Sequence, residues 1–403
     1  MKSNHENPFS ATRELGSEPE GTKGALAGVT VIDLTRYLSG PFCTMILGDL
    51  GAEVVKIEQP GKGDDARAIG PFVNGESMYF VSVNRNKKSV ELDLHSPEGR
   101  QVLKDLCRSA DVLVESFRPG TMEKWGLDYE TLKSENPRLI YASLTGFGQT
   151  GPMREAPAYD IVVQAMSGIM SITGQEGGPP TRVGASIGDL IPGLFLTIGI
   201  VSALYEREYS GLGQRLDIAM LDCLVTILEN AIARYMSTGV APGPIGNRHP
   251  SIAPFDTFQA KDGYLIIAAA NDSLFARLCT AIGTDELMQD ERFRDNPSRS
   301  KNQSDLKNLL EQVLGQKPVS HWINVLMSAG VPCAPVLSIP EVVKHPQVLA
   351  RGMVLELIQP LAGKVKVSGS PIKLSRTPPK VQKRAPLLGE HTGEVLQRLQ
   401  STD

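Results

Sequence analysis

The chain has 403 residues, more than one typical domain needs, so we expect two domains or one domain with a smaller one inserted. Hydrophobic residues make up 41% of the chain and charged residues 21%, a balance that excludes a disordered or fibrous protein. The formal net charge of -4 gives no general attraction to nucleic acid or to an anionic membrane, so an anionic ligand needs a local group of basic residues.

The N-terminal segment and the cysteines indicate where the protein works. Residues 1–23 contain four glutamates and no apolar run, which excludes a secretory signal and predicts a mobile tail. The five cysteines are widely spaced and form no Cys-x-x-Cys pair. This spacing argues against a disulfide framework and against a metal site, and it predicts a reducing compartment, the cytoplasm.

Short β-branched runs alternate with longer amphipathic stretches from residue 29 to about residue 221. This alternation predicts βα units and an α/β domain with a largely parallel, Rossmann-like sheet covered by helices. Ligands of such sheets bind at the loops that follow the strands. The predicted strands are residues 29–34, 53–58, 90–94, 112–117, 139–144 and 214–221.

Two stretches between these strands predict helices. Residues 159–174 place apolar side chains on one helical stripe, which predicts a helix that faces the core. Residues 190–204 are apolar almost throughout but fall short of the roughly 18 to 20 residues of a membrane span, so we expect a buried helix and no membrane association. The stripe of the first helix consists of Ile161, Val162, Ala165, Met166, Ile169 and Met170.

A change in composition near residues 239–254 marks the crossing into a smaller α/β domain. We expect a strand at residues 264–270 there, and helices near residues 273–282, 302–315 and 319–328. The chain then returns to the first domain. The predicted parts are a tail (1–23), the first part of the large domain (24–238), a linker with the small domain (239–335), and a return linker with the last part of the large domain (336–403).

Basic residues gather near the predicted strand ends, where a nucleotide-like cofactor would bind through its phosphates. A solvated strand entrance explains the run at residues 84–89 equally well. The Gly61-Lys62-Gly63 run is a weak dinucleotide signal, because two acids follow it and would repel a pyrophosphate. The basic residues are Arg36, Arg85, Lys87, Lys88, Arg118 and Lys124.

Asp189 opens the apolar helix and follows several small residues. Backbone N–H groups and the helix dipole keep a carboxylate at this position ionised and therefore nucleophilic, and small neighbours let a substrate approach. A plain N-cap role explains the same features, so the residues alone leave both interpretations open.

Longer runs carry a more specific signal: VIDLTRYLSGPFCTMILGDLGAEVVKIEQPGKGDDAR (31–67), YFVSVNRNKKSVELDL (79–94), ADVLVESFRPGTMEKWGLDY (110–129), LTGFGQTGP (144–152) and APLLGEHT (385–392). Together they resemble the class III CoA-transferase family, the formyl-CoA transferase and carnitine CoA-transferase type, over about residues 26–399. The resemblance implies an interlocked homodimer in which each chain has a Rossmann-like large domain and a small domain.

The resemblance also implies the roles of individual residues. Asp189 is the expected nucleophile, which forms an anhydride and then an aspartyl-CoA thioester. CoA and acyl-CoA are expected as substrates, with no permanently bound cofactor and no metal. The acyl site is expected at Leu38, Tyr159 and Asp160, backbone oxyanion donors at residues 243–247, and CoA contacts at Arg36, Ser39, Leu92, Ser116, Phe117, Arg118 and Lys124.

The resemblance does not identify the two carboxylic acids between which CoA is transferred, and it leaves some alternative functions open. The strings at residues 159–174 and 247–258 are most similar to the branch that uses succinyl-CoA with dicarboxylic acceptors. Formyl-CoA with oxalate remains an alternative, although the glycine-rich loop of that branch is absent. An α-methylacyl-CoA racemase is disfavoured because Tyr159 stands where racemases carry a histidine. A heteromer with a related chain is the alternative to the homodimer.

Overall fold

The computed structural model describes residues 23–401, apart from the side chain of Glu229, so the predicted mobile tail lies almost wholly outside the described residues. The chain forms two compact units. Unit 1 comprises the described residues up to Tyr159, Gly188–Cys223 and those from Gly352 onward, and unit 2 comprises Asp160–Ile187 and Leu224–Arg351. Both chain ends therefore contribute to unit 1. Residues 160–187 and 224–238, which the sequence analysis assigned to the large domain, group with unit 2.

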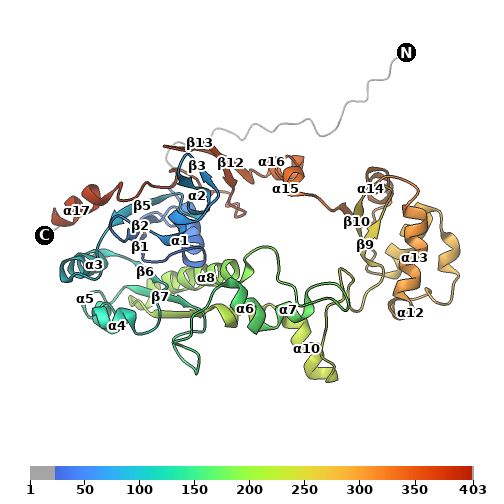
Figure 1. Ribbon diagram of the computed structural model, residues 1–403, viewed down its shortest axis with the longest axis horizontal. Helices are drawn as coiled ribbons and strands as arrows, with labels where there is room; N and C mark the ends of the chain where they lie inside the picture. The colour runs from blue at the N-terminus through green and yellow to red at the C-terminus, as the bar shows by residue number, and fades with distance from the viewer. Residues whose placement is uncertain (1–22, 402–403) are drawn as a thin grey trace, which may run out of the picture. The chain divides into compact units, whose positions relative to one another are not determined.

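A six-stranded, entirely parallel sheet forms the centre of unit 1 (Figure 1). The predicted strands are confirmed, although the third begins at Lys87, three residues earlier than expected. Because all strands run the same way, their carboxyl ends meet at one edge of the sheet. In spatial order the strands are β5 (Lys87–Glu91), β2 (Glu53–Glu58), β1 (Thr30–Asp33), β6 (Val112–Glu115), β7 (Ile140–Thr145) and β8 (Arg215–Ala219).

The two faces of this sheet differ in chemistry. One face carries Val55, Ile57 and Leu113 and packs with apolar side chains of the helices α3 (Pro97–Ser109), α4 (Thr121–Trp125) and α5 (Tyr129–Glu135). On the other face, alternate positions of β2 carry Lys56 and Glu58, which are also buried. Charged side chains are rarely buried unless they are paired, so this second face contains an internal ionic arrangement.

The other elements of unit 1 surround the sheet and include a hairpin and a helix from the C-terminal part of the chain. They are α1 (Ser39–Asp49), the 3-10 helix η1 (Asp65–Ala68), β3 (Phe72–Val73), β4 (Glu76–Ser77), α2 (Met78–Val83), α8 (Ile187–Ser210), β12 (Val354–Gln359), β13 (Gly363–Ser368) and α17 (Thr392–Gln400). The helix α9 (Met220–Thr226) crosses the boundary between the two units.

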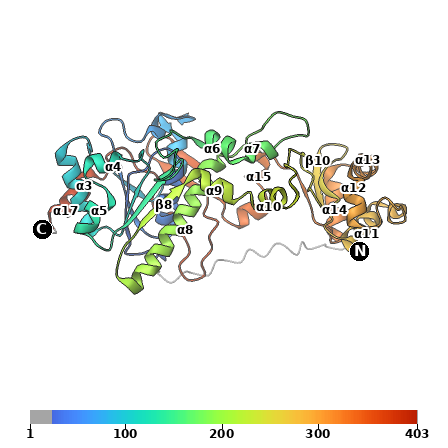
Figure 2. The ribbon, with the colours of Figure 1, turned by 90° about the horizontal axis from the view of Figure 1, so that it is seen from below.

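The helix α8 runs alongside β8 and is buried on one face only (Figure 2). The prediction of a buried helix is therefore wrong for the opposite face, which exposes an apolar stripe. By length and composition alone α8 could cross a membrane, and 44% of its most apolar window is buried inside the protein. The exposed stripe consists of Leu194, Ile198, Val201, Tyr205 and Tyr209.

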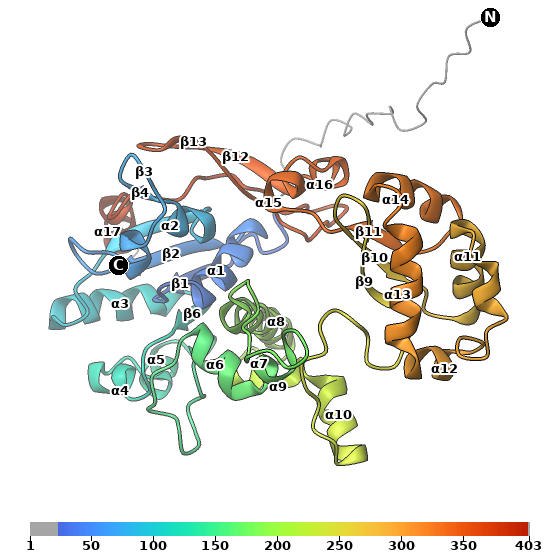
Figure 3. The same ribbon diagram turned by 45° about the vertical axis from the view of Figure 1, so that its right-hand side comes forward.

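Unit 2 contains a three-stranded antiparallel sheet in the order β11-β10-β9, packed against helices (Figure 3). Its core includes Phe258, Leu265 and Leu310. The strands are β9 (Phe255–Gln259), β10 (Tyr264–Ala268) and β11 (Cys333–Pro335). The helices are α6 (Asp160–Ser167), α7 (Ile169–Ile172), α10 (Glu229–Thr238), α11 (Asp272–Ile282), the 3-10 helix η2 (Asp285–Met288), α12 (Asn296–Lys301), α13 (Gln303–Leu314), α14 (Val319–Ser328), α15 (Ile339–Val342) and α16 (Pro346–Ala350).

The predicted helix at residues 159–174 differs from the observed structure in two ways. Gly168 adopts a left-handed φ of 94° and separates α6 from α7, a conformation that suits glycine best. The predicted core stripe is wrong, since Ile161 and Met166 are exposed while Val163 and Gln164 are buried. The apolar period of this segment therefore indicates a helix correctly, but the apolar stripe does not face the core.

Candidate functional site

Asp189 lines a hollow at the carboxyl edge of the unit 1 sheet, which we call the Asp189 hollow. The hollow is lined by loops that follow four strands and by the first turn of α8. This is where parallel α/β sheets place their ligands. The lining residues are Arg36 to Gly40 after β1, Ser116 to Pro119 after β6, Leu144 to Gly146, Arg154 and Ala156 to Tyr159 at and after β7, Met220 after β8, and Asp189.

The helix α8 begins at Ile187, so Asp189 lies inside its first turn and is not the N-cap residue that the sequence suggested. The position keeps the electrostatic benefit, because a carboxylate in the first turn is favoured by the helix dipole. The adjacent Gly188 is buried and Pro192 lies one turn further on. Asp189 is thus fixed at the start of a long helix whose inner face packs in unit 1.

A close contact between α1 and α8 fixes the backbone of Asp189. The Ser39 hydroxyl donates a hydrogen bond to the backbone oxygen of Asp189 at 2.7 Å. One turn further along α8, a Cβ atom on Gly193 would lie 2.7 Å from the Ser39 backbone oxygen. Only glycine permits this approach, so the two helices hold Ser39 against Asp189.

Three arginines line the Asp189 hollow: Arg36, Arg118 and Arg154. Arg36 Nη1 lies 3.1 Å from Asp65 Oδ2, and Arg154 Nη2 lies 3.6 Å from Glu155 Oε1, with the arginine side chains about half exposed. Partly exposed arginines can exchange such surface partners for a ligand carboxylate or phosphate at little cost. The hollow therefore suits an anionic ligand that brings a reacting carbon close to Asp189.

A second hollow with aromatic walls lies at the same sheet edge, and we call it the aromatic hollow. It shares Arg36 and Phe117 with the Asp189 hollow. The ring of Trp125 packs edge-on against Phe117 at 5.1 Å and against His95 at 5.6 Å between centroids. Aromatic and apolar walls of this kind suit a flat ring system. Leu34, Ile57, Leu92 and Leu94 complete the apolar part of the lining, and Glu58, Gln59, Asp64 and Asp93 contribute its polar part.

The structure brings most of the predicted site residues together. The Asp189 hollow collects Arg36, Leu38, Ser39, Ser116, Phe117, Arg118, Tyr159 and Asp189, and the aromatic hollow adds Leu92. Lys124 is exposed on α4 and is not among the residues that line either hollow, although its neighbour Trp125 is.

Two predicted features lie in unit 2. The carboxylate of Asp160 accepts hydrogen bonds from Gln164 Nε2 at 2.9 Å and lies 3.6 Å from Arg182 Nη1. In the predicted oxyanion loop, the Gly246 amide already donates to the backbone oxygen of Gly174 at 2.8 Å. That amide is therefore engaged inside unit 2 and does not point freely at a ligand.

The phosphate-binding interpretation is wrong for three of the basic residues. Arg85 is buried and pairs with Asp49 at 2.7 Å. Lys87 is also buried, and its Nζ lies 3.1 Å from an Asp33 carboxylate oxygen. Lys88 pairs with Glu53 and Glu394. These cations neutralise acids of the same unit, so the ligand-facing cations are Arg36, Arg118 and Arg154.

Sequence reasoning missed Arg154, Trp125 and His95. Arg154 follows the run at residues 144–152 that carries part of the family resemblance, and its charge was the available signal. Trp125 lies in the run at residues 110–129, next to Lys124, and His95 follows directly after the run at residues 79–94. Loop residues have no periodic pattern, so their placement at the site required the structure.

A parallel α/β sheet with a carboxylate among arginines at its carboxyl edge, next to an aromatic hollow, is an arrangement that suits an anionic, nucleotide-like ligand. Residues 26–392 match the CoA-transferase family III, so the chain belongs to that family. It is an enzyme of this class.

Curated relatives and a solved structure are similar over most of the chain. Identity is 49% to the acetyl-CoA:oxalate CoA-transferase of Acetobacter aceti, over 89% of this chain and 91% of that protein. It is 42% to the succinyl-CoA:mesaconate CoA-transferase of Haloarcula hispanica (93% and 96%) and 41% to the succinyl-CoA:glutarate CoA-transferase of Mus musculus (93% and 86%). A CAIB/BAIF family protein from Brucella suis has a TM-score of 0.84 at 40% identity, covering 94% of this chain and 100% of that chain.

Proposed function

We propose that the enzyme transfers CoA from succinyl-CoA to a dicarboxylic acid, with Asp189 as the covalent carrier. The observation that carries the proposal is the position of Asp189 in a hollow with three arginines. The acceptors named for the three relatives, oxalate, mesaconate and glutarate, are all dicarboxylic acids, and two of these relatives use succinyl-CoA. A dicarboxylate offers one carboxylate for the reaction and a second one for an arginine.

The proposed reaction consumes the CoA thioester of the donor acid and forms the CoA thioester of the acceptor acid, without net hydrolysis. The Asp189 carboxylate attacks the thioester carbon and expels CoA thiolate, which leaves a mixed anhydride. The thiolate then attacks the aspartyl carbon of the anhydride and releases the first acid, leaving an aspartyl-CoA thioester. The acceptor carboxylate attacks that thioester carbon, and the thiolate it expels attacks the acceptor's own carbonyl carbon, which frees Asp189. The arginines would stabilise the negative charge that develops on the oxygens.

We propose that CoA lies across both hollows. Its adenine ring would occupy the aromatic hollow near Leu92 and Trp125, and its thiol arm would pass Arg36 and Phe117 to reach Asp189. The order of the strands supports a Rossmann-like unit. Numbered along the chain, the six strands of the sheet lie in the order 3-2-1-4-5-6. The strand order therefore reverses between β1 and β6, and the loops after these two strands contribute to both hollows.

A panel of donors and acceptors tests the substrate assignment. Succinyl-CoA and acetyl-CoA are each incubated with oxalate, mesaconate, glutarate and the monocarboxylate butyrate, and the CoA esters formed are identified by chromatography and mass spectrometry. We expect succinyl-CoA with one of the dicarboxylates to exceed butyrate by about 10- to 100-fold in kcat/KM, the value of one charge-assisted contact. Equal use of butyrate would contradict the dicarboxylate assignment, and a preference for acetyl-CoA with oxalate would replace the proposed pair.

The same panel assigns the cation that holds the second carboxylate. Replacing Arg154→Gln is expected to raise KM for the dicarboxylate by about 10-fold or more and to leave KM for the CoA ester within about threefold. Arg138→Gln is the matched control, because Arg138 is an equally exposed arginine of unit 1 near Glu208, and it lines neither hollow. A rise in KM for the CoA ester alone would place Arg154 on the CoA phosphates.

We propose that the chain works as an interlocked homodimer in the cytoplasm. The exposed stripe of α8, which includes Ile198 and Tyr209, and the exposed Met236 of α10 present more apolar surface than a monomer usually leaves in water. The five cysteines are unpaired, which suits a reducing compartment. Analytical ultracentrifugation of the purified chain should give twice the chain mass. A monomer, or activity that requires a second, related chain, would contradict the homodimer.

A further inference from the structure

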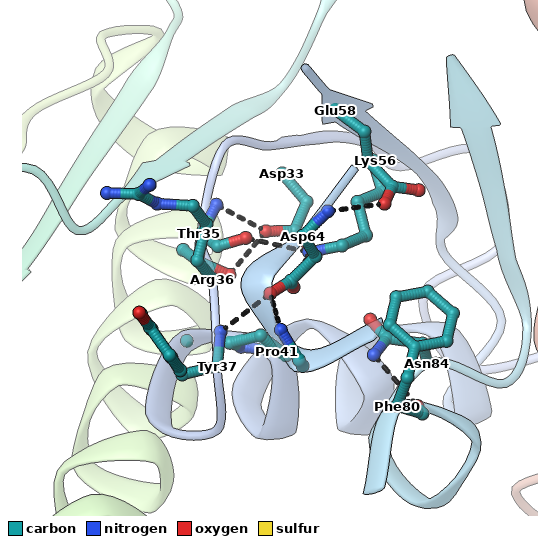
Figure 4. A network of polar contacts seen from close by, with 12 residues as sticks. Asp33, Thr35, Arg36, Tyr37, Pro41, Lys56, Glu58, Asp64, Phe80 and Asn84 are labelled. Carbon is teal, nitrogen blue, oxygen red and sulfur yellow. Dashed lines mark hydrogen bonds and ion pairs between the residues drawn. The ribbon is translucent and has the colours of Figure 1, made fainter. Parts of the chain in front are cut away.

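A cluster of buried charges lies beneath the turn between β1 and α1 (Figure 4). Lys56 Nζ is 2.8 Å from Asp64 Oδ2, and Lys87 Nζ is 3.1 Å from Asp33 Oδ2. All four of these side chains are 0% exposed. Glu58 and Arg67 extend the group, with Arg67 Nε 2.7 Å from Glu58 Oε2. We call Asp33, Lys56, Glu58, Asp64, Arg67 and Lys87 the buried ion cluster.

The charges within the cluster oppose the effect of burial on Asp33 and Lys56, whereas burial lowers the pKa of Lys87 to about 8 despite its contact with Asp33. Burial by itself would raise the pKa of Asp33, but Lys87 and Lys56 hold it well below its usual range. Burial would lower the pKa of Lys56, but Asp64 and Asp33 raise it instead. Buried ion pairs of this kind contribute little net stability compared with apolar residues of similar size, because removing the charges from water is costly. Stability alone is therefore a weak explanation for the cluster.

The cluster also binds the backbone of the turn at three points. Lys56 Nζ donates to the Thr35 backbone oxygen at 2.7 Å, and Lys87 Nζ donates to the Pro41 backbone oxygen at 3.0 Å. Between these points, the Tyr37 amide donates to Asp64 Oδ1 at 3.0 Å (Figure 4). The cluster thus holds the chain before and after Leu38 and Ser39, which lie at the centre of the segment Arg36–Gly40 that lines the Asp189 hollow.

Tyr37, the middle of the three contact points, has a strained backbone conformation. Tyr37 has a φ of 67°, a left-handed conformation that costs a non-glycine residue free energy and persists only where the surroundings impose it. The hydrogen bond from its amide to Asp64 is such a constraint. Two residues later, Ser39 donates to the backbone oxygen of Asp189. A continuous series of contacts therefore runs from Lys56 and Asp64 through the turn to Asp189.

We infer that Lys56 and Asp64 are positioning residues for CoA transfer: they hold the Thr35–Pro41 turn so that Leu38 and Ser39 keep the CoA arm and the Asp189 backbone aligned. The inference rests on the proposed function, because it concerns the geometry of that reaction. Lys56 lines neither hollow, and the Asp64 carboxylate, which lies in the wall of the aromatic hollow, is 0% exposed, so both residues act on the reaction through the turn.

The test replaces both members of the Lys56–Asp64 pair, so that neither charge is left buried without its partner. In the double variant Lys56→Met with Asp64→Asn, the Thr35 backbone oxygen loses its cation. The matched control is Arg85→Met with Asp49→Asn, which removes an equally buried ion pair of unit 1 at 2.7 Å whose contacts go to Asn86 and to the Ser368 backbone oxygen, away from the turn. Both double variants are measured below their own unfolding temperatures, together with the wild type.

We expect the first double variant to lose about 30- to 100-fold in kcat while KM for the acceptor stays within about threefold, as misalignment of reacting groups predicts. The control is expected to unfold at a lower temperature and to keep kcat within about threefold. A wild-type kcat in the first double variant, or an equal loss of kcat in both double variants, would overturn the inference.

A second variant keeps the inference testable if the double variant does not fold. Asp64→Ser leaves Lys56 beside the acidic groups of Asp33 and Glu58. It retains a hydroxyl for the Ala66 amide but is too short to bind the Tyr37 amide, and it should show the same fall in kcat together with faster hydrogen exchange of the Tyr37 amide. Unchanged exchange and unchanged kcat would overturn the inference. A wild type that transfers CoA without labelling Asp189 would instead overturn the proposed carrier, and the comparison of kcat values would still stand.

Discussion

Replacing Asp189→Ala is expected to lower kcat for CoA transfer by about 10⁴-fold or more, because it removes the only group to which we assign the covalent step. The affinity for free CoA should remain within about threefold, since the other residues that line the two hollows stay in place. Steady-state kinetics gives the first quantity, and isothermal titration calorimetry gives the second.

Asp189→Asn is the isosteric control for this prediction. The amide keeps the volume and the place in the first turn of α8, but it is a poor nucleophile, so the loss of kcat should match that of the alanine variant. A variant of either kind that retains more than about a tenth of the wild-type kcat would show that another group carries the acyl chain.

Replacing Gly193→Ala is expected to cost about 100-fold in kcat, the second largest effect. The new Cβ would lie 2.7 Å from the Ser39 backbone oxygen, and because that atom belongs to the backbone, α1 must shift. The shift would break the hydrogen bond from Ser39 to the Asp189 backbone and misplace the reacting groups. Kinetics at a temperature at which the variant is folded, as judged by circular dichroism, measures this effect.

Gly199→Ala provides the matched control on the same helix. Its Cβ would also meet a neighbour at 2.7 Å, but that neighbour is the terminal Cδ2 of Leu216, a flexible side chain that can rotate away. Alanine improves helix propensity equally at both positions, by roughly 1 kcal/mol. We therefore expect Gly199→Ala to keep its activity. A similar loss in both variants would show that the helix interior, and not the approach to Ser39, determines the effect.

The sheet of unit 1 could be predicted because its signal is local. Parallel strands are buried on both faces, and the nearly continuous apolar run at residues 139–144 shows this in its composition, whereas residues 53–58 were recognisable by their β-branched residues. The exact start of β5 could not be predicted, because Lys87 and Lys88 look like solvated residues before a strand. Their partners are remote, since Lys87 binds Asp33 and Lys88 binds Glu394, and no local pattern reveals such pairs.

The burial of helices was predicted less well than their presence. The period of apolar residues predicts that a helix has an apolar face, but it does not say what covers that face. Ile161 on α6 and Ile198 on α8 are apolar and exposed, which a single-chain interpretation of the pattern could not anticipate. The proposed dimer would supply the missing cover for such residues.

The candidate site was predicted in part. Asp189 stood out because a charged residue at the start of an apolar helix is unusual, and the resemblance gave it a role. Arg154 carried no such signal, and its place in the Asp189 hollow follows from the path of the loop after β7. The CoA contact assigned to Lys124 stays a prediction, since its side chain lines neither hollow.

The most direct test of the central claim is the mass of the peptide that contains Asp189 after incubation with succinyl-CoA and no acceptor, followed by rapid quenching and digestion. We predict that this peptide carries CoA in thioester linkage, and that the label disappears when an acceptor acid is added. A peptide that remains unmodified while the enzyme turns over, or CoA attached to a different residue, would contradict the assignment of Asp189 as the covalent carrier.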